Sequence, residues 1–151
     1  MTQYKAPIQD IRFALNDVLG GATLFQRLPG FESATPDIVD AVLDEAARFA
    51  EQVLAPLNAS ADQEGCTLDK ATASVRTPKG FKEAYAKFVE GGWPALTIPA
   101  AFGGQELPET IGVILKEMID AANMSWSNFP MLSHGASEAL KVHGEKWQQE
   151  A

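Results

Sequence analysis

The stretch "TPDIVDAVLDEAARFAEQVL", residues 35–54, decides the fold class because its apolar residues recur every three or four positions. This spacing is typical of an amphipathic helix with one buried face. Thr35 is a plausible N-cap, Pro36 suits the first helical position, and Asp37 complements the helix dipole. Pro56, just beyond the stretch, is expected to kink or end the helix. The apolar face comprises Val39, Val42, Leu43, Ala46, Ala50, Val53, Leu54 and Leu57.

Helical spacing dominates the rest of the chain as well. It predicts a helix within residues 8–19, another from Thr77-Pro78 to Gly91-Gly92, and a third that Pro108 opens. The apolar stripe of the first of these helices comprises Ile8, Ile11, Leu15, Val18 and Leu19. A last helix is expected to begin at Asn128, a cap candidate, with Pro130 close behind. We therefore expect an all-α fold, a helical bundle of about five or six helices.

Two stretches depart from this helical pattern. Residues 58–77 are small, polar and aperiodic, which predicts a long loop. The stretch "GGWPALTIPAAFGGQELPE", residues 91–109, is rich in glycine and proline yet strongly apolar. Within it, "ALTIPAAF", residues 95–102, comes nearest to the pattern of a strand, but it contains Pro99, which argues against pairing in a sheet. We expect this segment to cross the core, anchored by Trp93, Leu96, Ile98 and Phe102.

Composition limits the class of protein. The chain has 151 residues, 46% of them hydrophobic, and a net charge of −8. This charge argues against nucleic acid and anionic membrane as partners, because both attract clustered Lys and Arg. The start "MTQYKAPIQD" lacks the features of a signal peptide, and no window approaches the ~18 apolar residues of a membrane span. We expect a soluble, cytoplasmic protein.

Spacing alone reveals little chemistry. His134 and His143 do not match a standard zinc spacing, so no metal site is predicted. Cys66 is the only cysteine and has no obvious base nearby, which favours a spectator thiol. The glycines of residues 91–104 lack the spacing of a dinucleotide-binding loop. The carboxylates of residues 37–51 are typical of a solvated helix face. Without further information the sequence predicts a helical domain with no assignable reaction.

Three stretches follow one another along the chain: "GFKEAYAKFVEGGWPALTIPAAFGGQELPE", "TIGVILKEMIDAAN" and "FPMLSHGASEALKVHGEKWQQE". Taken together and in this order, they resemble the acyl-CoA dehydrogenase family. Within them the family pattern matches Gly92-Trp93, Ile98-Pro99, Phe102-Gly103-Gly104, Glu117 and His143-Gly144. The opening "YKAPIQDIRFALNDVL" resembles the extra N-terminal helix of the branch that includes methylthiopropanoyl-CoA (3-methylmercaptopropionyl-CoA) dehydrogenases and their long-chain relatives.

The resemblance implies the domain organisation and the reaction of the whole enzyme. Residues 1–34 would be an N-terminal helical extension, and residues 35–151 the N-terminal α domain of a flavoprotein oxidoreductase of fatty acid metabolism. Such an enzyme uses FAD to convert an acyl-CoA thioester to a trans-2-enoyl-CoA. Its middle β domain carries the flavin-site motif and its C-terminal α domain carries the carboxylate base. Neither is recognisable in this sequence, so the chain alone is expected to be inactive.

No catalytic residue is therefore expected in this chain, and Glu83, Glu90, Glu117 and Glu138 are not assigned that role. Cofactor-binding residues stay unknown. By resemblance, the acyl chain lies along the start of the helix after "ANMSWS". Met131 and Gly135 share a face there, where Met can adapt to a flexible tail and Gly leaves space. The same residues also suit an ordinary packed helix. The acyl-CoA-binding residues implied are Ser127, Asn128, Met131, Leu132 and Gly135.

The implied partners are an acyl-CoA substrate, an electron-transfer flavoprotein or similar acceptor, and further copies of the chain in a homo-oligomer. An alternative reading is a freestanding α-helical module that binds a protein or an acyl chain and performs no catalysis. An open reading frame that continues for several hundred residues past Ala151 favours the enzyme, whereas a natural stop there favours the module.

Overall fold

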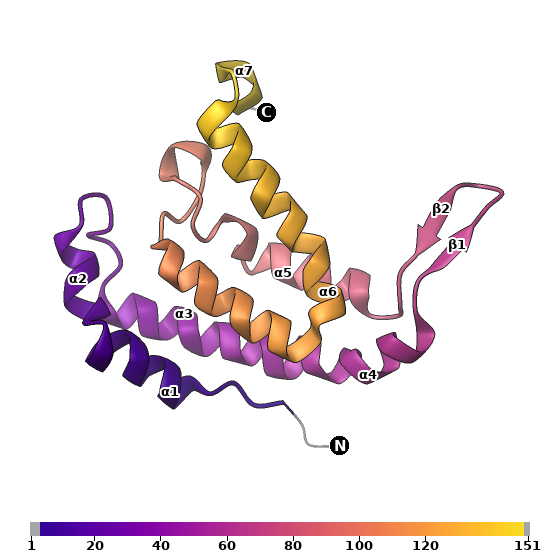
Figure 1. Cartoon of the computed structure of the whole chain (residues 1–151), viewed down its shortest axis with the longest axis horizontal. Coiled ribbons are helices and arrows are strands. Elements are labelled where there is room, and N and C mark those ends of the chain that lie inside the picture. Colours follow the sequence, from indigo (N-terminus) through magenta and orange to yellow (C-terminus); the bar gives the residue numbers. More distant parts are fainter. Residues whose placement is uncertain (1–3, 150–151) are drawn as a thin grey trace.

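The computed structural model describes residues 4–149, and their regular structure is helical apart from one short hairpin (Figure 1). A long rod runs through the molecule, made of α3 (Pro36–Phe49), the π-helical segment η2 (Ala50–Leu54) and α4 (Ala55–Glu64). Thr35 occupies the N-cap of α3, although its side chain makes no capping hydrogen bond. Pro56 falls in the first turn of α4, where a helix tolerates proline, so the rod continues past it. The all-α prediction is confirmed.

The N-terminal segment contains α1 (Ile8–Arg12), η1 (Phe13–Val18) and α2 (Gly21–Arg27). Helix α1 lies along α3, and α2 lies beyond the N-terminal end of α3 (Figure 1). Ile11 and Leu15 are buried against the core, as the predicted helical stripe requires. At the far end of that stripe, Val18 and Leu19 are more than 60% exposed, so the prediction is wrong for them. Within the stripe, Ile11 and Leu15 are therefore buried, whereas the last two residues are exposed.

Ion pairs hold this segment to the rod. Arg12 donates from Nε to Asp40 and from Nη2 to Asp44, at 3.0 Å each. Glu51 accepts from the Lys5 ammonium at 2.6 Å and from the backbone N–H of Ala6 at 3.0 Å. The hydrogen bond from Lys5 is the main reason why the pKa of the Glu51 carboxyl lies below its usual range.

Glu51→Gln is expected to lower the free energy of unfolding at pH 7 by roughly 0.2–1 kcal/mol, because the Lys5 end of the pair is exposed. The folded-state pKa of Glu51 is depressed, so its stabilisation is fully present above the unfolded value of 4.5. It is lost as the pH falls through the lower folded value. Urea titrations at pH 7 and pH 3 measure this, and a wild-type advantage that grows at pH 3 would contradict the assignment.

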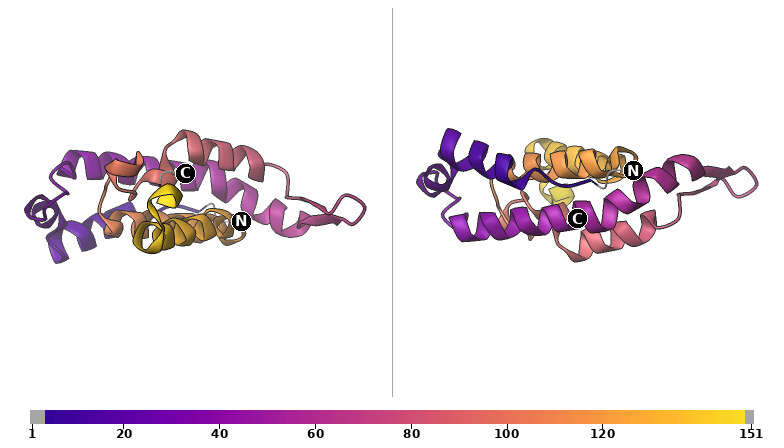
Figure 2. Two further views of the ribbon diagram at one scale, coloured as in Figure 1. Left: turned by 90° about the horizontal axis from the view of Figure 1, so that it is seen from above. Right: turned by 90° about the horizontal axis from the view of Figure 1, so that it is seen from below.

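Residues 58–77 do not form the predicted loop. Residues 58–64 continue α4, and β1 (Thr67–Asp69) pairs antiparallel with β2 (Ser74–Arg76). The Asp69 carboxylate holds the hairpin turn by accepting from the backbone N–H of Ala71 and the hydroxyl of Thr72. Both strands are exposed, and the hairpin projects beyond one end of the molecule (Figure 2). The loop prediction was wrong because α4 buries only Ala61, which gives it no apolar period.

The glycine- and proline-rich stretch follows α5 (Phe81–Glu90) and contains the short 3-10 helices η3 (Trp93–Ala95) and η4 (Ala100–Phe102). Leu96 is buried, as predicted, but Phe102 is 44% exposed and does not anchor the segment. Gly104 is required because a Cβ there would lie 1.9 Å from the carbonyl oxygen of Ile98. The backbone therefore turns back on itself without burying every large side chain.

The long helix α6 (Glu109–His143) bends sharply at Asn123, whose φ and ψ of −161° and 84° are not helical. We call residues 109–122 the first arm and residues 124–143 the second arm. Asn123 caps the second arm, because its Oδ1 accepts the backbone N–H of Trp126 at 3.1 Å. The predicted cap at Asn128 is wrong, and Asn128 lies exposed inside the second arm. A short helix, α7 (Lys146–Gln149), follows.

An aromatic cluster joins three of these elements. Trp126 of α6 packs edge-on against Phe49 of α3 and Phe88 of α5, with ring centroids 5.9 and 5.4 Å apart. Its indole N–H donates to the carbonyl of Phe81 at 3.2 Å. Trp126 thus fixes the second arm to the rod and to α5. Across residues 4–149, no helix combines the length and apolarity needed to cross a membrane.

Candidate functional site

The bend at Asn123 gives α6 the shape of a V, and a cleft of about 220 Å³ lies between its arms. The first arm contributes residues from Glu109 to Asp120, and the second arm contributes residues from Ser127 to Ser137. Helix α5 and the turn around η3 complete the wall. The residues from these two elements are Tyr85, Phe88, Trp93, Pro94, Leu96 and Thr97.

The wall is apolar except near the bend and along the rims. Phe88, Leu96, Leu115 and Ile119 are buried and line the cleft. Near the bend, the hydroxyl of Ser127 donates to Asp120 Oδ1 at 2.5 Å. The other carboxylate oxygen of Asp120 accepts from the Lys116 ammonium. The cleft can therefore hold a flexible apolar group, with a hydrogen-bonded polar network at its closed end.

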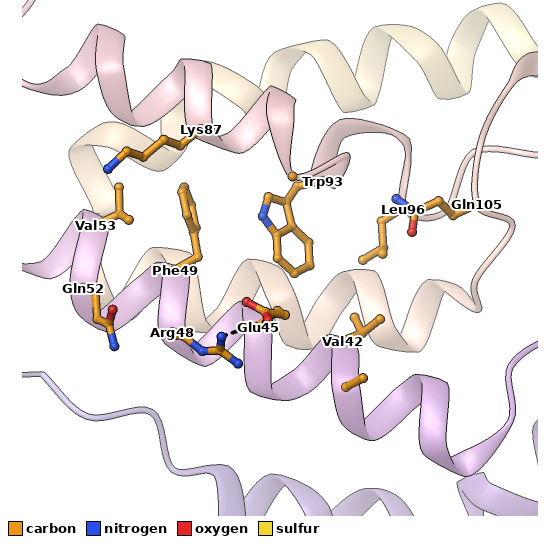
Figure 3. A pocket seen from close by; sticks show the side chains of 12 residues that line it. Val42, Glu45, Arg48, Phe49, Gln52, Val53, Lys87, Trp93, Leu96 and Gln105 are labelled. Atoms are coloured by element: carbon orange, nitrogen blue, oxygen red, sulfur yellow. Dashed lines mark ion pairs between the residues drawn. The ribbon is translucent and has the colours of Figure 1, made fainter.

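A second hollow lies on the other side of Trp93, between α3 and α5 (Figure 3). It measures about 530 Å³ and forms a surface groove. Figure 3 shows the rings of Phe49 and Trp93 directed into it, with the Glu45–Arg48 ion pair, 3.0 Å long, along one side. Trp93 and Leu96 line both hollows, so one thin wall separates the groove from the cleft.

The structure brings two of the five predicted acyl-binding residues into the cleft. Ser127 is buried at its closed end, and Met131 is 42% exposed farther along the second arm. Asn128, Leu132 and Gly135 are exposed and do not line it. A Cβ on Gly135 would meet no atom within 4 Å, so this glycine faces open space. That these three residues contact an acyl-CoA therefore stays a prediction, and any such contact would lie outside the cleft.

The remaining candidate groups are dispersed. His134 lines the cleft, whereas His143 and Cys66 are exposed elsewhere. Within residues 4–149, no three His, Cys, Asp or Glu side chains gather closely enough to hold a metal ion. Glu138 pairs with Lys141 on its own helix. Glu83, Glu90 and Glu117 are exposed outside the cleft and the groove.

Sequence reasoning missed most of the cleft wall. Tyr85 and Phe88 had the spacing of a core face and gave no sign of a cavity. Lys116 and Asp120 stand four residues apart, a spacing that indicates an ion pair on one helix face. That spacing could have been recognised, but the meeting of Asp120 with Ser127 depends on the bend at Asn123.

Comparison with known proteins gives evidence about the family of this chain that is independent of the geometry of the cleft. The family described as "Acyl-CoA dehydrogenase, N-terminal domain" matches residues 37–151. A 3-methylmercaptopropionyl-CoA dehydrogenase of Ruegeria pomeroyi is 36% identical over 146 residues, which cover 97% of this chain and 24% of that protein.

Two further relatives act on other acyl groups according to their names. The broad-specificity linear acyl-CoA dehydrogenase FadE5 of Mycobacterium tuberculosis is 30% identical over 123 residues, 82% of this chain and 20% of that protein. A butyryl-CoA dehydrogenase of Syntrophomonas wolfei is 30% identical over 148 residues, 91% of this chain and 24% of that protein. The chain spans about a quarter of the length of these relatives or less.

Proposed function

The chain belongs to the acyl-CoA dehydrogenase family, and from this we propose that residues 35–151 form the N-terminal α domain of a longer FAD-dependent enzyme. Residues 1–34 would be an extension that braces α3. The complete enzyme would remove one hydrogen each from the α and β carbons of an acyl-CoA thioester and release a trans-2-enoyl-CoA. This chain would supply one wall of the acyl site and no catalytic base.

The cleft between the arms of α6 is the observation that carries this proposal. Its apolar wall is suited to the methylenes of an acyl tail, because burying each CH₂ contributes about 0.8 kcal/mol. Met131 adds an adaptable thioether side chain to the second arm. We propose that Asn128, Leu132 and Gly135, on the outer surface of that arm, contact parts of the ligand that extend beyond the cleft.

FAD does not fit the cleft between the arms of α6. The cleft of about 220 Å³ is smaller than the 300–1,000 Å³ that ligands of drug size typically occupy. The helix end at its rim is also unsuitable for a pyrophosphate, because Pro108 lacks an N–H and Glu109 brings a negative charge. We therefore assign the flavin to the remainder of the longer enzyme and derive no step through it.

The partners follow from the same proposal. The substrate would be an acyl-CoA, and the reduced enzyme would pass electrons to an electron-transfer flavoprotein or a similar acceptor. We propose a homo-oligomer located in the cytoplasm. The names of the relatives range from butyryl-CoA to broad linear acyl-CoA. The preferred acyl group therefore has to be determined by measuring activity with acyl-CoAs of different chain lengths.

The proposal is tested with two purified proteins, the 151-residue chain and the longer polypeptide that contains it. The longer protein should carry about one FAD per chain and reduce an acceptor dye when acyl-CoA is added. The 151-residue chain should be colourless and inactive. A colourless longer protein without dye reduction would exclude the dehydrogenase, and a yellow, active 151-residue chain would exclude the assignment of FAD and base to other residues.

Met131→Trp should raise the KM of the longer enzyme for long-chain acyl-CoA about tenfold or more, because the indole would fill part of the cleft. Val142→Trp is the matched control, since Val142 is 66% exposed on the same arm and outside the cleft. Steady-state kinetics measure both variants. Equal KM values would place the acyl tail elsewhere.

A further inference from the structure

Residues of both arms line the cleft from the bend of the V to its open end. Asp120 and Ser127 lie three and four residues from Asn123 on opposite arms, at the closed end. Glu109 and Ser137 mark the open end. Each arm extends about 20 Å from the bend to that end at 1.5 Å per residue. A small rotation at the bend is therefore amplified at the mouth.

One hydrogen bond joins the arms beside the bend. The Ser127 hydroxyl donates to Asp120 Oδ1 at 2.5 Å, and Ser127 is only 3% exposed. Lys116 neutralises the carboxylate from within the first arm. Because a hydrogen bond to an ionised acceptor is short and roughly twice as strong as a neutral one, this bond resists opening of the V.

Little else in the described chain holds the far part of the second arm. Trp126 and Phe129 contact the aromatic cluster and Phe81, but both lie within the arm's first two turns. Every residue from Met131 to Ser137 is exposed. The angle of the arm is thus set near its beginning, where the Asp120–Ser127 bond lies.

Taking the proposed function as its premise, we infer that Asp120 is a positioning residue that sets the opening of the V and so selects the acyl groups that the cleft admits. A rotation of about 10° on an arm of about 20 Å moves the mouth by about 3–4 Å. This displacement is comparable to the 3.5–4.0 Å contact distance between carbon atoms. An acyl tail that contacts both walls of the cleft at one angle of the V would then contact only one wall at a wider angle.

Ser127→Ala and Asp120→Asn test the inference. Ser127→Ala removes the donor, and Asp120→Asn keeps an acceptor oxygen but removes the charge. Each has a matched control outside the cleft. Ser125→Ala removes a hydroxyl that bonds to Asn123 within the bend, and Glu117→Gln removes an exposed carboxylate of the first arm.

The opening is measured directly in the 151-residue chain by pulsed electron paramagnetic resonance. Spin labels at Thr110→Cys and Ala139→Cys, in a Cys66→Ser background, report the distance between the arms. We expect Ser127→Ala to shift or broaden this distance by about 3 Å or more and Asp120→Asn to do so by less. Both controls should leave it unchanged. Far-ultraviolet circular dichroism and thermal melts confirm that each variant is folded.

Selectivity is measured in the longer enzyme as the ratio of kcat/KM for hexadecanoyl-CoA to that for butanoyl-CoA. We expect Ser127→Ala to change this ratio about tenfold and the controls to keep it within about twofold. A change in the ratio separates positioning from mere destabilisation, which lowers the active fraction equally for both substrates.

The possible outcomes are distinct. An unchanged label distance in a folded Ser127→Ala chain overturns the inference, whatever the enzyme does. A changed distance with an unchanged ratio overturns the role in selectivity. If the wild-type longer enzyme oxidises no acyl-CoA, the proposed function fails and the selectivity role fails with it. The label distances then still show whether the Asp120–Ser127 bond sets the angle.

Discussion

Trp126→Ala is expected to lower the free energy of unfolding by about 3–5 kcal/mol, the usual cost of removing a large buried aromatic side chain. Trp126 is fully buried and packs edge-on against Phe49 and Phe88. Its removal would leave a cavity and remove the hydrogen bond to the carbonyl of Phe81. Because domains are stable by only about 5–15 kcal/mol, this change would bring the chain close to unfolding at 25 °C. Urea denaturation followed by circular dichroism measures it.

Two further variants separate the causes. Trp126→Phe keeps most of the packing but removes the indole N–H, so it should cost about 1–3 kcal/mol from the lost hydrogen bond to Phe81 and the smaller ring. Trp147→Ala is the control, because Trp147 is 68% exposed and its loss should change stability by less than about 0.5 kcal/mol. If Trp126→Ala cost no more than Trp147→Ala, the aromatic cluster would not be the centre of the core.

Asn123→Ala is expected to cost roughly 1–4 kcal/mol, because it removes the cap of the second arm and a second, buried hydrogen bond. The cap is the bond from the Trp126 N–H to Asn123 Oδ1, and the second bond runs from Asn123 Nδ2 to the Leu54 carbonyl at 3.2 Å. The same urea titration measures the loss.

The control for this second change is Asn128→Ala, since Asn128 is exposed inside the second arm. Alanine favours a helix more than asparagine does, so this variant should be neutral or slightly stabilising. Asn123→Ser keeps a capping acceptor for the Trp126 N–H but loses the donor to Leu54, and its stability should fall between wild type and Asn123→Ala. Equal stabilities for Asn123→Ala and Asn128→Ala would refute the assigned cap.

The contrast between Asn123 and Asn128 shows how much of the fold could be predicted from the sequence. Local spacing was sufficient for α3 and the first arm of α6, whose buried faces repeat with the helical period. Both asparagines are acceptable caps by residue type. The choice of Asn123 depends on the Leu54 carbonyl, which approaches only in the folded state. The loop prediction failed at residues 58–64 for the opposite reason, because helix α4 buries only Ala61 and shows no apolar period.

The cleft was predictable only where it follows one helix. Ser127 and Met131, two of the residues that the resemblance singled out, are one helical turn apart on the second arm and both line the cleft. Tyr85, Phe88 and Trp93 come from α5 and η3, and only the packing of Trp126 against α5 brings them to the same cavity. Spacing along one segment carries no information about such a meeting.

The bond between Asn123 and Leu54 also affects how quickly the chain folds. It joins residues 69 positions apart. Separate helices form within about 0.1–1 μs, whereas closing a loop of this length costs about 4 kcal/mol of chain entropy before the contact contributes anything. Contacts between distant residues slow folding, so we expect α6 to dock on the α3–α4 rod in a late, rate-limiting step. The V would then be absent from early intermediates, and the cleft between its arms would be among the last parts of the chain to form.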